Sequence, residues 1–505
     1  MKNLLNRYER RQITICEYFF KLDEPVFIEQ VLQDLSISEK TFLADVDQLH
    51  EQFPFMEIER INQYCSLKMD RSNDFKKIYH YFLTESPAFH LLNYLFFQVS
   101  LILTDIEEML LISRTSLYRL IKKINQYFQD NGFNLQISNN PCQILGNEGH
   151  YRLFYQRYFS EILSPTNNPL QEIIPSNFYD FYNQCLRQIN YQPNFSQYNQ
   201  LMIAILINVH RISQGYNVEA SSWPQMSTSR KDRQNLSSIK EYFATHYKLD
   251  PKKLTGFDMF FPYFDNYFAP NNIYLTKLLS DHGKIAKQNQ FMKEIILDTC
   301  DEFKLDCPNL EDVLLAIHNS TCHHYYFPVN QDFILNYRLP YFKVIQTNFP
   351  KFYHYIYHKV AEYINFCQFN ANVQLIHHFM DEIFTIWKDL YYHLNHFNKP
   401  IKLIILKGYH DGMIDLIHDI LSCEFSNQIQ ISFYDGPNYF ESLYLPDRLK
   451  SYDLVLAPFR MPKDLHPHCI STNYFLDKTD YENIFNEIVK IRKERNAKRY
   501  QYQLT

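Results

Sequence analysis

Apolar residues recur at helical spacing in two segments of the N-terminal third, and these segments align with each other without a gap. They are residues 37–53 (ISEKTFLADVDQLHEQF) and 112–128 (ISRTSLYRLIKKINQYF), at an offset of 75. The apolar positions step by four and then by three, which is the spacing of one buried helix face. Such a repeat predicts two copies of one structural unit. Identical or similar residues form the pairs Ile37/Ile112, Ser38/Ser113, Phe42/Leu117, Val46/Ile121, Leu49/Ile124 and Phe53/Phe128.

Each copy also has the signals of a winged helix-turn-helix. Ser38 and Ser113 stand where a side-chain oxygen accepts a free backbone N–H at the start of a helix. A short apolar helical pattern precedes each cap. Because a helix, a turn, a second helix and a hairpin form a DNA-reading unit, we expect one unit in residues 1–70 and another in residues 71–165. The alternating patterns that predict the hairpins are Phe55–Ile61 with Tyr64–Met69, and Phe133–Ile137 with Gln143–Leu145.

The second copy has the more basic recognition helix. No acidic residue occurs from 113 to 129, and arginine suits guanine edges while lysine suits phosphates. In the first copy, Glu39, Asp45, Asp47 and Glu51 would repel a phosphate backbone. The alternative is that one or both copies are structural helical hairpins. The residues expected to contact double-stranded DNA are Arg114, Thr115, Ser116, Tyr118, Arg119, Lys122 and Lys123, together with Lys40 and Thr41.

Composition narrows the classes of function. The chain has 9 Gly in 505 residues and neither a Walker nor a dinucleotide fingerprint. We therefore expect neither a nucleotide-dependent enzyme nor a cofactor. The net charge is −6, and residues 1–160 contain 17 Lys and Arg against 20 Asp and Glu. DNA binding must therefore rest on local charge, because the domain total gives it no support.

The cysteines and the most apolar stretch bear on the compartment. Ten cysteines without a CxxC pair, and an N-terminus without an apolar leader, indicate reduced thiols in a cytoplasmic protein. Residues 91–103 are interrupted by Asn93, Gln98 and Ser100 and are shorter than the ~20 apolar residues of a spanning helix. We expect a buried helix there and no membrane partner.

In the order of these elements the chain resembles the Mga/AtxA family of Gram-positive transcriptional (virulence) regulators. The segments Gln143–Glu148 (QILGNE) and Tyr151–Phe154 (YRLF) are similar to the family's entry into its regulatory domains. The resemblance implies a mainly α, multidomain, non-enzymatic transcriptional regulator. Two helical regulation domains of the sugar phosphotransferase system (PTS), residues 170–282 and 283–396, would precede an enzyme IIB-like α/β domain, residues 399–505. PTS phosphocarrier proteins would be transient partners.

The middle of the chain has a weak repeat of its own. Leu206–Ser213 aligns with Leu314–Thr321 at an offset of 108, so that His210 and His318 coincide. Because regulation domains of this type are phosphorylated on histidine, these two are the first candidates, and the added charge would alter packing. The alternative, in a chain with 20 histidines, is a packed or solvated role. The weaker candidates are His282, His377 and His378.

Residues 400–460 alternate apolar strands with helical patterns. Ile401–Leu406, Ile429–Phe433 and Asp453–Ala457 predict a small parallel sheet with connecting helices. In the enzyme IIB family an active-site cysteine follows the first strand, but here the loop Lys407–Gly412 (KGYHDG) has none, and His410 is the one residue that could substitute for it. We therefore expect this domain to form a homodimer and not to transfer phosphate.

Two histidine clusters and a basic tail complete the sequence features. His466 with His468 and Cys469, and the pair His323–His324, lack a second ligand pair at finger-like spacing, so loop histidines are expected rather than metal sites. The run Lys490–Arg499 is expected to be a solvated helix end. Two rival functions remain. A PTS-regulated RNA-binding antiterminator would have a β-rich N-terminal module, and a phosphotransferase component would need the missing cysteine.

Overall fold

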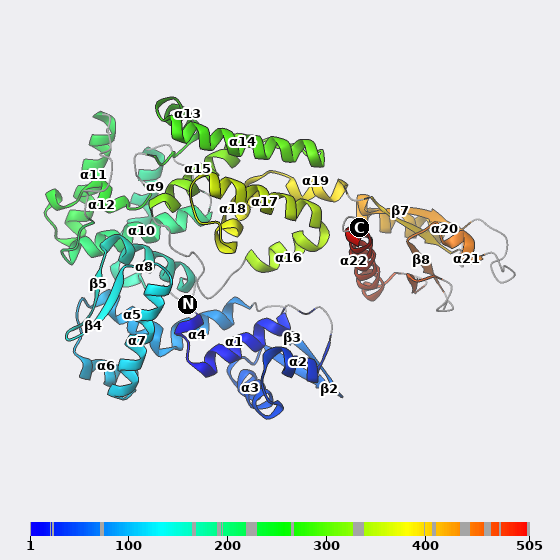
Figure 1. Ribbon diagram of the computed structural model, residues 1–505, viewed down its shortest axis with the longest axis horizontal. Coiled ribbons are helices and arrows are strands. Elements are labelled where there is room, and N and C mark those ends of the chain that lie inside the picture. The colour runs from blue at the N-terminus through cyan, green and yellow to red at the C-terminus, as the bar shows by residue number, and fades with distance from the viewer. Residues whose placement is uncertain are drawn as a thin grey trace. The chain divides into compact units, whose positions relative to one another are not determined.

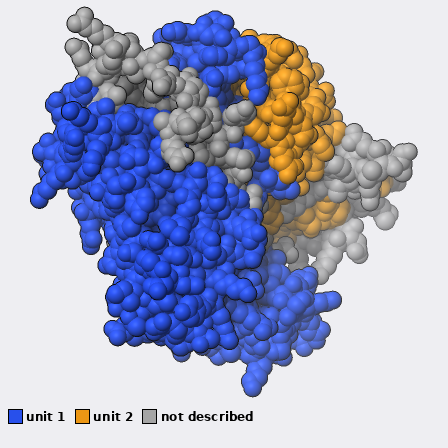
Figure 2. Space-filling view, turned by 60° about the vertical axis from the view of Figure 1, so that its left-hand side comes forward, with its two compact units in different colours: residues 1–286, 315–337, 372–375 blue, residues 287–314, 338–371, 376–505 orange. Residues whose placement is uncertain are grey.

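A computed structural model describes most of the chain, and the described residues form two compact units (Figure 1; Figure 2). The first unit consists of residues 1–286, 315–337 and 372–375, and the second of residues 287–314, 338–371 and 376–505. The fold is mainly helical and multidomain, as the sequence predicts. The residues outside the description are 1, 21, 23–24, 71–74, 164–167, 189–192, 194, 219–229, 264–266, 327–337, 398, 407–410, 435–444, 459–465, 474–475 and 502–505.

The first repeat copy folds into three helices and a small sheet. The Ser38 side chain accepts a hydrogen bond from the Thr41 backbone N–H at the start of the third helix, which confirms the predicted cap. The predicted hairpin is confirmed, and a two-residue strand that the sequence pattern does not predict pairs with it. The elements are α1 (Arg7–Phe20), β1 (Val26–Phe27), α2 (Ile28–Leu35), α3 (Glu39–Gln52), β2 (Met56–Ile61) and β3 (Tyr64–Met69).

The second copy has the same two helices followed by a hairpin, and two other helices precede them. Ser113 caps its long helix by accepting from the Ser116 N–H, and the predicted hairpin turns at Asn140–Pro141. The expectation of one helix over residues 91–103 is only partly confirmed, because α5 ends at Phe97 and Ile102 is 66% exposed. The elements are α4 (Lys76–Glu85), α5 (Pro87–Phe97), α6 (Leu103–Leu110), α7 (Arg114–Asp130), β4 (Leu135–Asn139), β5 (Cys142–Gly146) and α8 (Glu148–Ile162).

The regular elements of the middle of the chain are all helices among the described residues, as predicted. Apolar side chains line the buried face of α10, where Leu206, Ile207 and Val209 have no measurable exposure. The helices are α9 (Phe178–Gln188), α10 (Phe195–Ser213), α11 (Arg230–Tyr247), α12 (Gly256–Phe260), α13 (Asn272–Asp281), α14 (Gly283–Phe303), α15 (Leu310–Tyr326), α16 (Arg338–Asn348), α17 (Pro350–Phe366), α18 (Val373–Ile386) and α19 (Leu390–Phe397). Within the described residues, no helix is long and apolar enough to cross a membrane.

The C-terminal domain is built on a four-stranded parallel sheet with the order β7-β6-β8-β9. The three predicted strands are confirmed, and β9 is an addition. Apolar side chains of β6 alternate between two clusters, one containing Leu403 and the other Ile404, so both faces of the sheet are covered. The elements are β6 (Ile401–Ile405), α20 (Asp411–Phe425), β7 (Ile429–Phe433), α21 (Leu445–Leu449), β8 (Leu454–Ala457), β9 (Cys469–Ser471) and α22 (Lys478–Gln501). His410 lies outside the described residues.

Two expectations about polar residues are corrected by the fold. His323 and His324 lie in the helix α15 and not in a loop. The basic tail is helical, but it is not simply solvated. Arg492 is 9% exposed, and Arg495 pairs with Asp453 and donates to the carbonyl of Lys399 over 3.1 Å. Arg495 therefore fastens α22 to its own domain.

Candidate nucleic-acid interface

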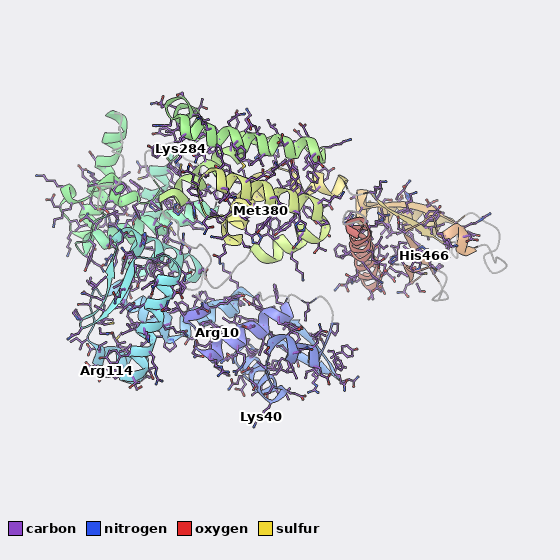
Figure 3. All side chains as sticks on the ribbon, in the orientation of Figure 1. Arg10, Lys40, Arg114, Lys284, Met380 and His466 are labelled. Atoms are coloured by element: carbon purple, nitrogen blue, oxygen red, sulfur yellow. The ribbon has the colours of Figure 1, made fainter. Side chains whose placement is uncertain are left out.

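The first turns of α7 present a polar face to solvent. Leu117, Ile121 and Ile124 fill the buried side of this helix, because they recur at steps of four and three. The side chains between them therefore point outward, and Arg114 is at the first turn (Figure 3). Six of the seven residues expected on this helix are exposed: Arg114, Thr115, Ser116, Tyr118, Arg119 and Lys122.

Arg114 is held in place by a neighbour from the preceding helix. Its Nε forms an ion pair with Glu107 of α6, although the side chain remains 45% exposed. The hydrogen bond to Glu107, followed by one to Tyr118, raises the pKa of Arg114, so the guanidinium is charged at any relevant pH. Glu107 thus occupies the Nε side of the Arg114 guanidinium, and the rest of the guanidinium faces solvent.

Lys123 differs from the rest of the set. It is half-buried, and its Nζ donates to the backbone carbonyl of Leu5 over 2.5 Å. Burial lowers the pKa of Lys123, and the nearby charge of Arg10 lowers it further. Lys123 therefore connects α7 to the N-terminal segment and is poorly placed to contact a phosphate.

The first copy is less acidic on its surface than the sequence suggests. Asp45 has a side-chain exposure of 1%, and its two oxygens accept hydrogen bonds from Nε and Nη2 of Arg11, the latter over 2.8 Å. The charge of Asp45 is thus neutralised inside the unit, which corrects the expectation that it repels DNA. Glu39 pairs with Arg60 over 2.8 Å. Lys40 is exposed, while Thr41 is half-buried and lies 2.8 Å from the Ser38 hydroxyl.

The segment Gly146-Asn147-Glu148 joins the second hairpin to α8, and each residue has a separate role. Gly146 has φ of +133°, and a Cβ there would overlap the carbonyl oxygen of Asn134, so only glycine fits. Asn147 caps α8 by accepting from the His150 N–H over 3.0 Å. Glu148 begins the helix and enters a buried charge cluster.

That cluster binds α8 to the helical domain through Glu148, Arg152, Arg211 and Asp258. Arg152 is 1% exposed, and its Nη1 lies 2.6 Å from Asp258 Oδ1 while its Nε lies 2.9 Å from Glu148 Oε1. Arg211 donates to Glu148 Oε2 over 2.7 Å. Its guanidinium lies 3.8 Å from the ring centres of Tyr151 and Tyr216. The sequence pattern does not predict the cluster, and only the opposite charges at Glu148 and Arg152, four residues apart, could have signalled part of it.

The two matched histidines pack against different neighbours, and His210 is partly buried while His318 is buried. His210 of α10 packs its ring 5.0 Å from that of Phe96 and 6.0 Å from that of Phe97, both on α5. Burial lowers the pKa of His210 to about 4. His318 of α15 is 6% exposed and donates from Nε2 to the Tyr267 carbonyl over 2.7 Å, and burial lowers its pKa. Both rings are therefore neutral at pH 7.

The other candidate histidines differ in access. His282 follows α13 and is exposed, with its ring 5.2 Å from that of Tyr267. His377 is 9% exposed and its Nε2 lies 2.9 Å from the Tyr353 hydroxyl, whereas His378 is half-buried. Among the described residues no group of three His, Cys, Asp or Glu side chains has the geometry of a metal site.

The first copy has a further basic feature that sequence reasoning missed. Arg7, Arg10 and Arg11 of α1 line one hollow with the turn between α2 and α3. These arginines and Thr14 are three or four residues apart in the sequence. That spacing indicates a single polar helix face, and it is the signal that could have revealed this feature.

These elements are those of a multidomain helix-turn-helix protein, and comparison with known proteins gives the same class. Residues 71–159, from just before α4 into α8, match the model of the Mga helix-turn-helix domain. Residues 171–390 match the model of the M protein trans-acting positive regulator (MGA) PRD domain, where PRD stands for PTS regulation domain. A protein of Streptococcus pneumoniae serotype 4, named "Putative trans-acting regulator", is 21% identical over 477 residues, which cover 94% of this chain and 96% of that relative.

The chain belongs to the Mga-like family of regulators, because the helix-turn-helix and PRD models match in the family's order and the relative is similar across nearly the whole length.

Proposed function

We propose that the protein is a DNA-binding transcriptional regulator that acts as a homodimer and is tuned by histidine phosphorylation from the PTS. The observation that carries the proposal is the exposed, acid-free face of α7, capped by Ser113 and followed by the β4–β5 hairpin. A capped helix of this kind enters the major groove with its N-terminal residues on base edges, and a hairpin serves as a wing.

Residues on α7 divide into two roles in this proposal. Arg114 and Arg119 lie five positions apart near the N-terminal end, where a guanidinium reaches the O6 and N7 acceptors of guanine. Lys122 lies almost one turn further on and suits a phosphate, which positions the helix without reading sequence. The first copy adds Lys40 and Thr41 at the start of α3.

Contacts within the first unit support a route from the regulation domains to the DNA-binding copy. The His210 ring packs at a tilt against the rings of Phe96 and Phe97, and its neighbour Arg211 is bound to Glu148 of α8. A phosphate on His210 has no place against two phenyl rings, so modification would separate α10 from α5. His282 is already exposed, whereas modification of His210 or His318 requires local opening.

The C-terminal domain is proposed as the dimer-forming part. Its strand order and its parallel sheet support the enzyme IIB-like interpretation, and the loop after β6 contains no cysteine in the sequence. Leu416 of α20 and Phe485 of α22 are 43% and 53% exposed, as side chains of a self-associating surface would be. A twofold dimer would place two DNA-binding arms on one duplex and increase avidity.

The proposal is tested by replacing both arginines of α7. The parent protein selects a duplex from a random pool, and its affinity for that duplex and for a scrambled one is measured by fluorescence anisotropy. The variant R114A/R119A should weaken binding to the selected duplex only, by ~1–3 kcal/mol for each base that is no longer read. The control K252Q/K253Q removes two exposed charges from the short helix Pro251–Lys253 and should bind like the parent. Equal affinities of R114A/R119A and parent, or preference for RNA, would refute the assignment.

A further inference from the structure

Three arginines lie together on one face of α1, and the start of that helix is firmly held. The Asn6 side chain accepts from the backbone N–H groups of Tyr8 and Glu9, each over 2.9 Å. The Glu9 carboxylate in turn accepts from the Asn6 N–H over 2.8 Å. This reciprocal cap fixes the first turn of α1, and Arg7, Arg10 and Arg11 project from it.

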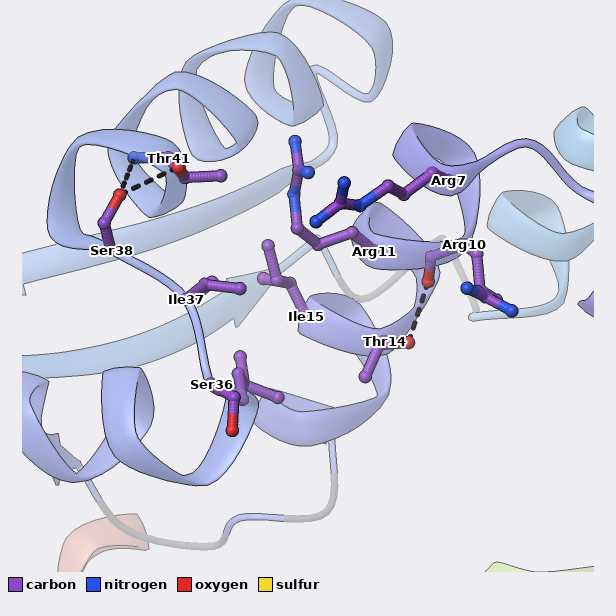
Figure 4. Close-up of a pocket in the computed structure, with 10 residues that line it drawn as sticks. Arg7, Arg10, Arg11, Thr14, Ile15, Ser36, Ile37, Ser38 and Thr41 are labelled. Carbon is purple, nitrogen blue, oxygen red and sulfur yellow. Dashed lines mark hydrogen bonds between the residues drawn. The ribbon is translucent and has the colours of Figure 1, made fainter.

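The turn between α2 and α3 forms the opposite wall. Ser36 takes a left-handed conformation, with φ of 53°, which turns the chain toward α1, and Ile37 and Ser38 follow. Between the two walls is a hollow of about 450 Å³, and its lining contains three arginines and no carboxylate. Figure 4 shows α1 facing this turn across the hollow.

The positive charge of the hollow is largely available. Arg11 is neutralised by Asp45. Arg7 and Arg10 are exposed, and neither forms an ion pair with another described residue. The start of α3 adds to this charge, because the Ser38 side chain engages the Thr41 N–H while the amides of Glu39 and Lys40 have no intrahelical acceptor. The free guanidinium of Arg7 and a helix start thus face the same space, while Arg10 lines the hollow with its guanidinium turned away from the α2–α3 turn (Figure 4).

We propose that this hollow binds a phosphate of the DNA backbone beside the groove that α3 enters. Guanidinium forks match phosphate oxygens in pairs, and a helix start adds backbone donors. DNA is favoured over a free phosphate compound because the hollow lies between the end of α2 and the start of α3. In such units the helix that precedes the recognition helix crosses the DNA backbone. This inference rests on the proposed function, and it gives the first copy a phosphate clamp on α1 in place of a basic recognition helix.

The test uses the full chain with Arg7→Gln and Arg10→Gln. Both side chains are exposed, so the double variant should fold, and its thermal unfolding by circular dichroism checks this. Arg11 is left intact because its removal would leave the buried Asp45 unpaired. The slope of log affinity against log salt should become shallower by about 0.9 for each phosphate that the variant no longer neutralises. Affinity should fall equally on the selected and the scrambled duplex, unlike the loss in R114A/R119A. The control K252Q/K253Q should keep the parental slope.

The outcomes separate the two proposals. If the parent selects no duplex, the proposed function fails and the clamp fails with it. If the parent binds DNA and R7Q/R10Q keeps its affinity and salt slope, only the clamp is overturned. A second arm compares thermal unfolding in inorganic phosphate and in chloride at equal ionic strength. Stabilisation of the parent but not of R7Q/R10Q by phosphate, together with equal salt slopes on DNA, would assign the hollow to a free phosphate ligand and overturn the DNA assignment.

Discussion

Arg152 is predicted to be one of the most sensitive positions of the first unit, and the change Arg152→Met tests this. Methionine is similarly long and unbranched but donates no hydrogen bond. The change removes the ion pair to Asp258 at 2.6 Å and the contact with Glu148 at 2.9 Å. It also removes donors to the carbonyls of Asp258 and Tyr216, at 2.8 Å and 3.1 Å. These groups are inside the protein, where water replaces lost donors poorly.

The expected loss follows from what remains after the change. Glu148 keeps Arg211, but among the described residues the carboxylate of Asp258 keeps the neutral donors of the Asn217 side chain and the Val218 N–H alone. Leaving a buried charge without its partner costs about 3–5 kcal/mol. By contrast, Lys68→Met breaks an exposed pair with Glu59 and should cost at most about 1 kcal/mol.

The assay is urea unfolding followed by circular dichroism, with free energies from linear extrapolation. The double variant R152M/D258N removes both charges and should lose less than the sum of the two single variants, because the unpaired carboxylate is gone. A loss below about 1 kcal/mol for R152M, or strict additivity in the double variant, would show that the cluster is not an essential ion-pair network.

Three other predictions concern single side chains. Since burial lowers the pKa of His210 to about 4 from its unfolded value near 6.5, stability should fall as pH drops from 6.5 toward 4; thermal melts of H210Q should show a flatter dependence, and a profile identical to the parent's would contradict this. F485E should shift light-scattering mass toward monomer while N486E, the same charge on the next exposed residue, should not; a dimeric F485E would place the interface elsewhere. D45N should lower the unfolding free energy by about 1–3 kcal/mol without strengthening DNA binding, because Asp45 is buried against Arg11. D47N removes an exposed charge and should strengthen DNA binding without lowering the unfolding free energy. Stronger DNA binding by D45N would show that Asp45 acts as a surface charge.

The sequence by itself determined the features that depend on neighbours along the chain. Helix caps at Ser38 and Ser113 were predictable because a serine hydroxyl accepts an N–H three residues later. The hairpins and the parallel strands followed from period-two and continuous apolar patterns in the same way. The family's junction at Gly146 was visible as a motif, although its reason, the approach of Asn134, lies in the fold.

The tertiary structure decided which charges are available, because a charge is exposed or neutralised by residues that are distant in sequence. The sequence predicts that Asp45 is a surface acid, but in the structure it pairs with Arg11, which is 34 positions away. Lys123 looked like a phosphate ligand, but the Leu5 carbonyl, 118 positions away, occupies it. Arg152 and Asp258 meet across 106 positions. Helical periodicity is local and therefore readable from sequence, whereas burial and ion pairing depend on how segments pack. Only the folded chain therefore shows which cations remain free on the surface proposed to bind DNA.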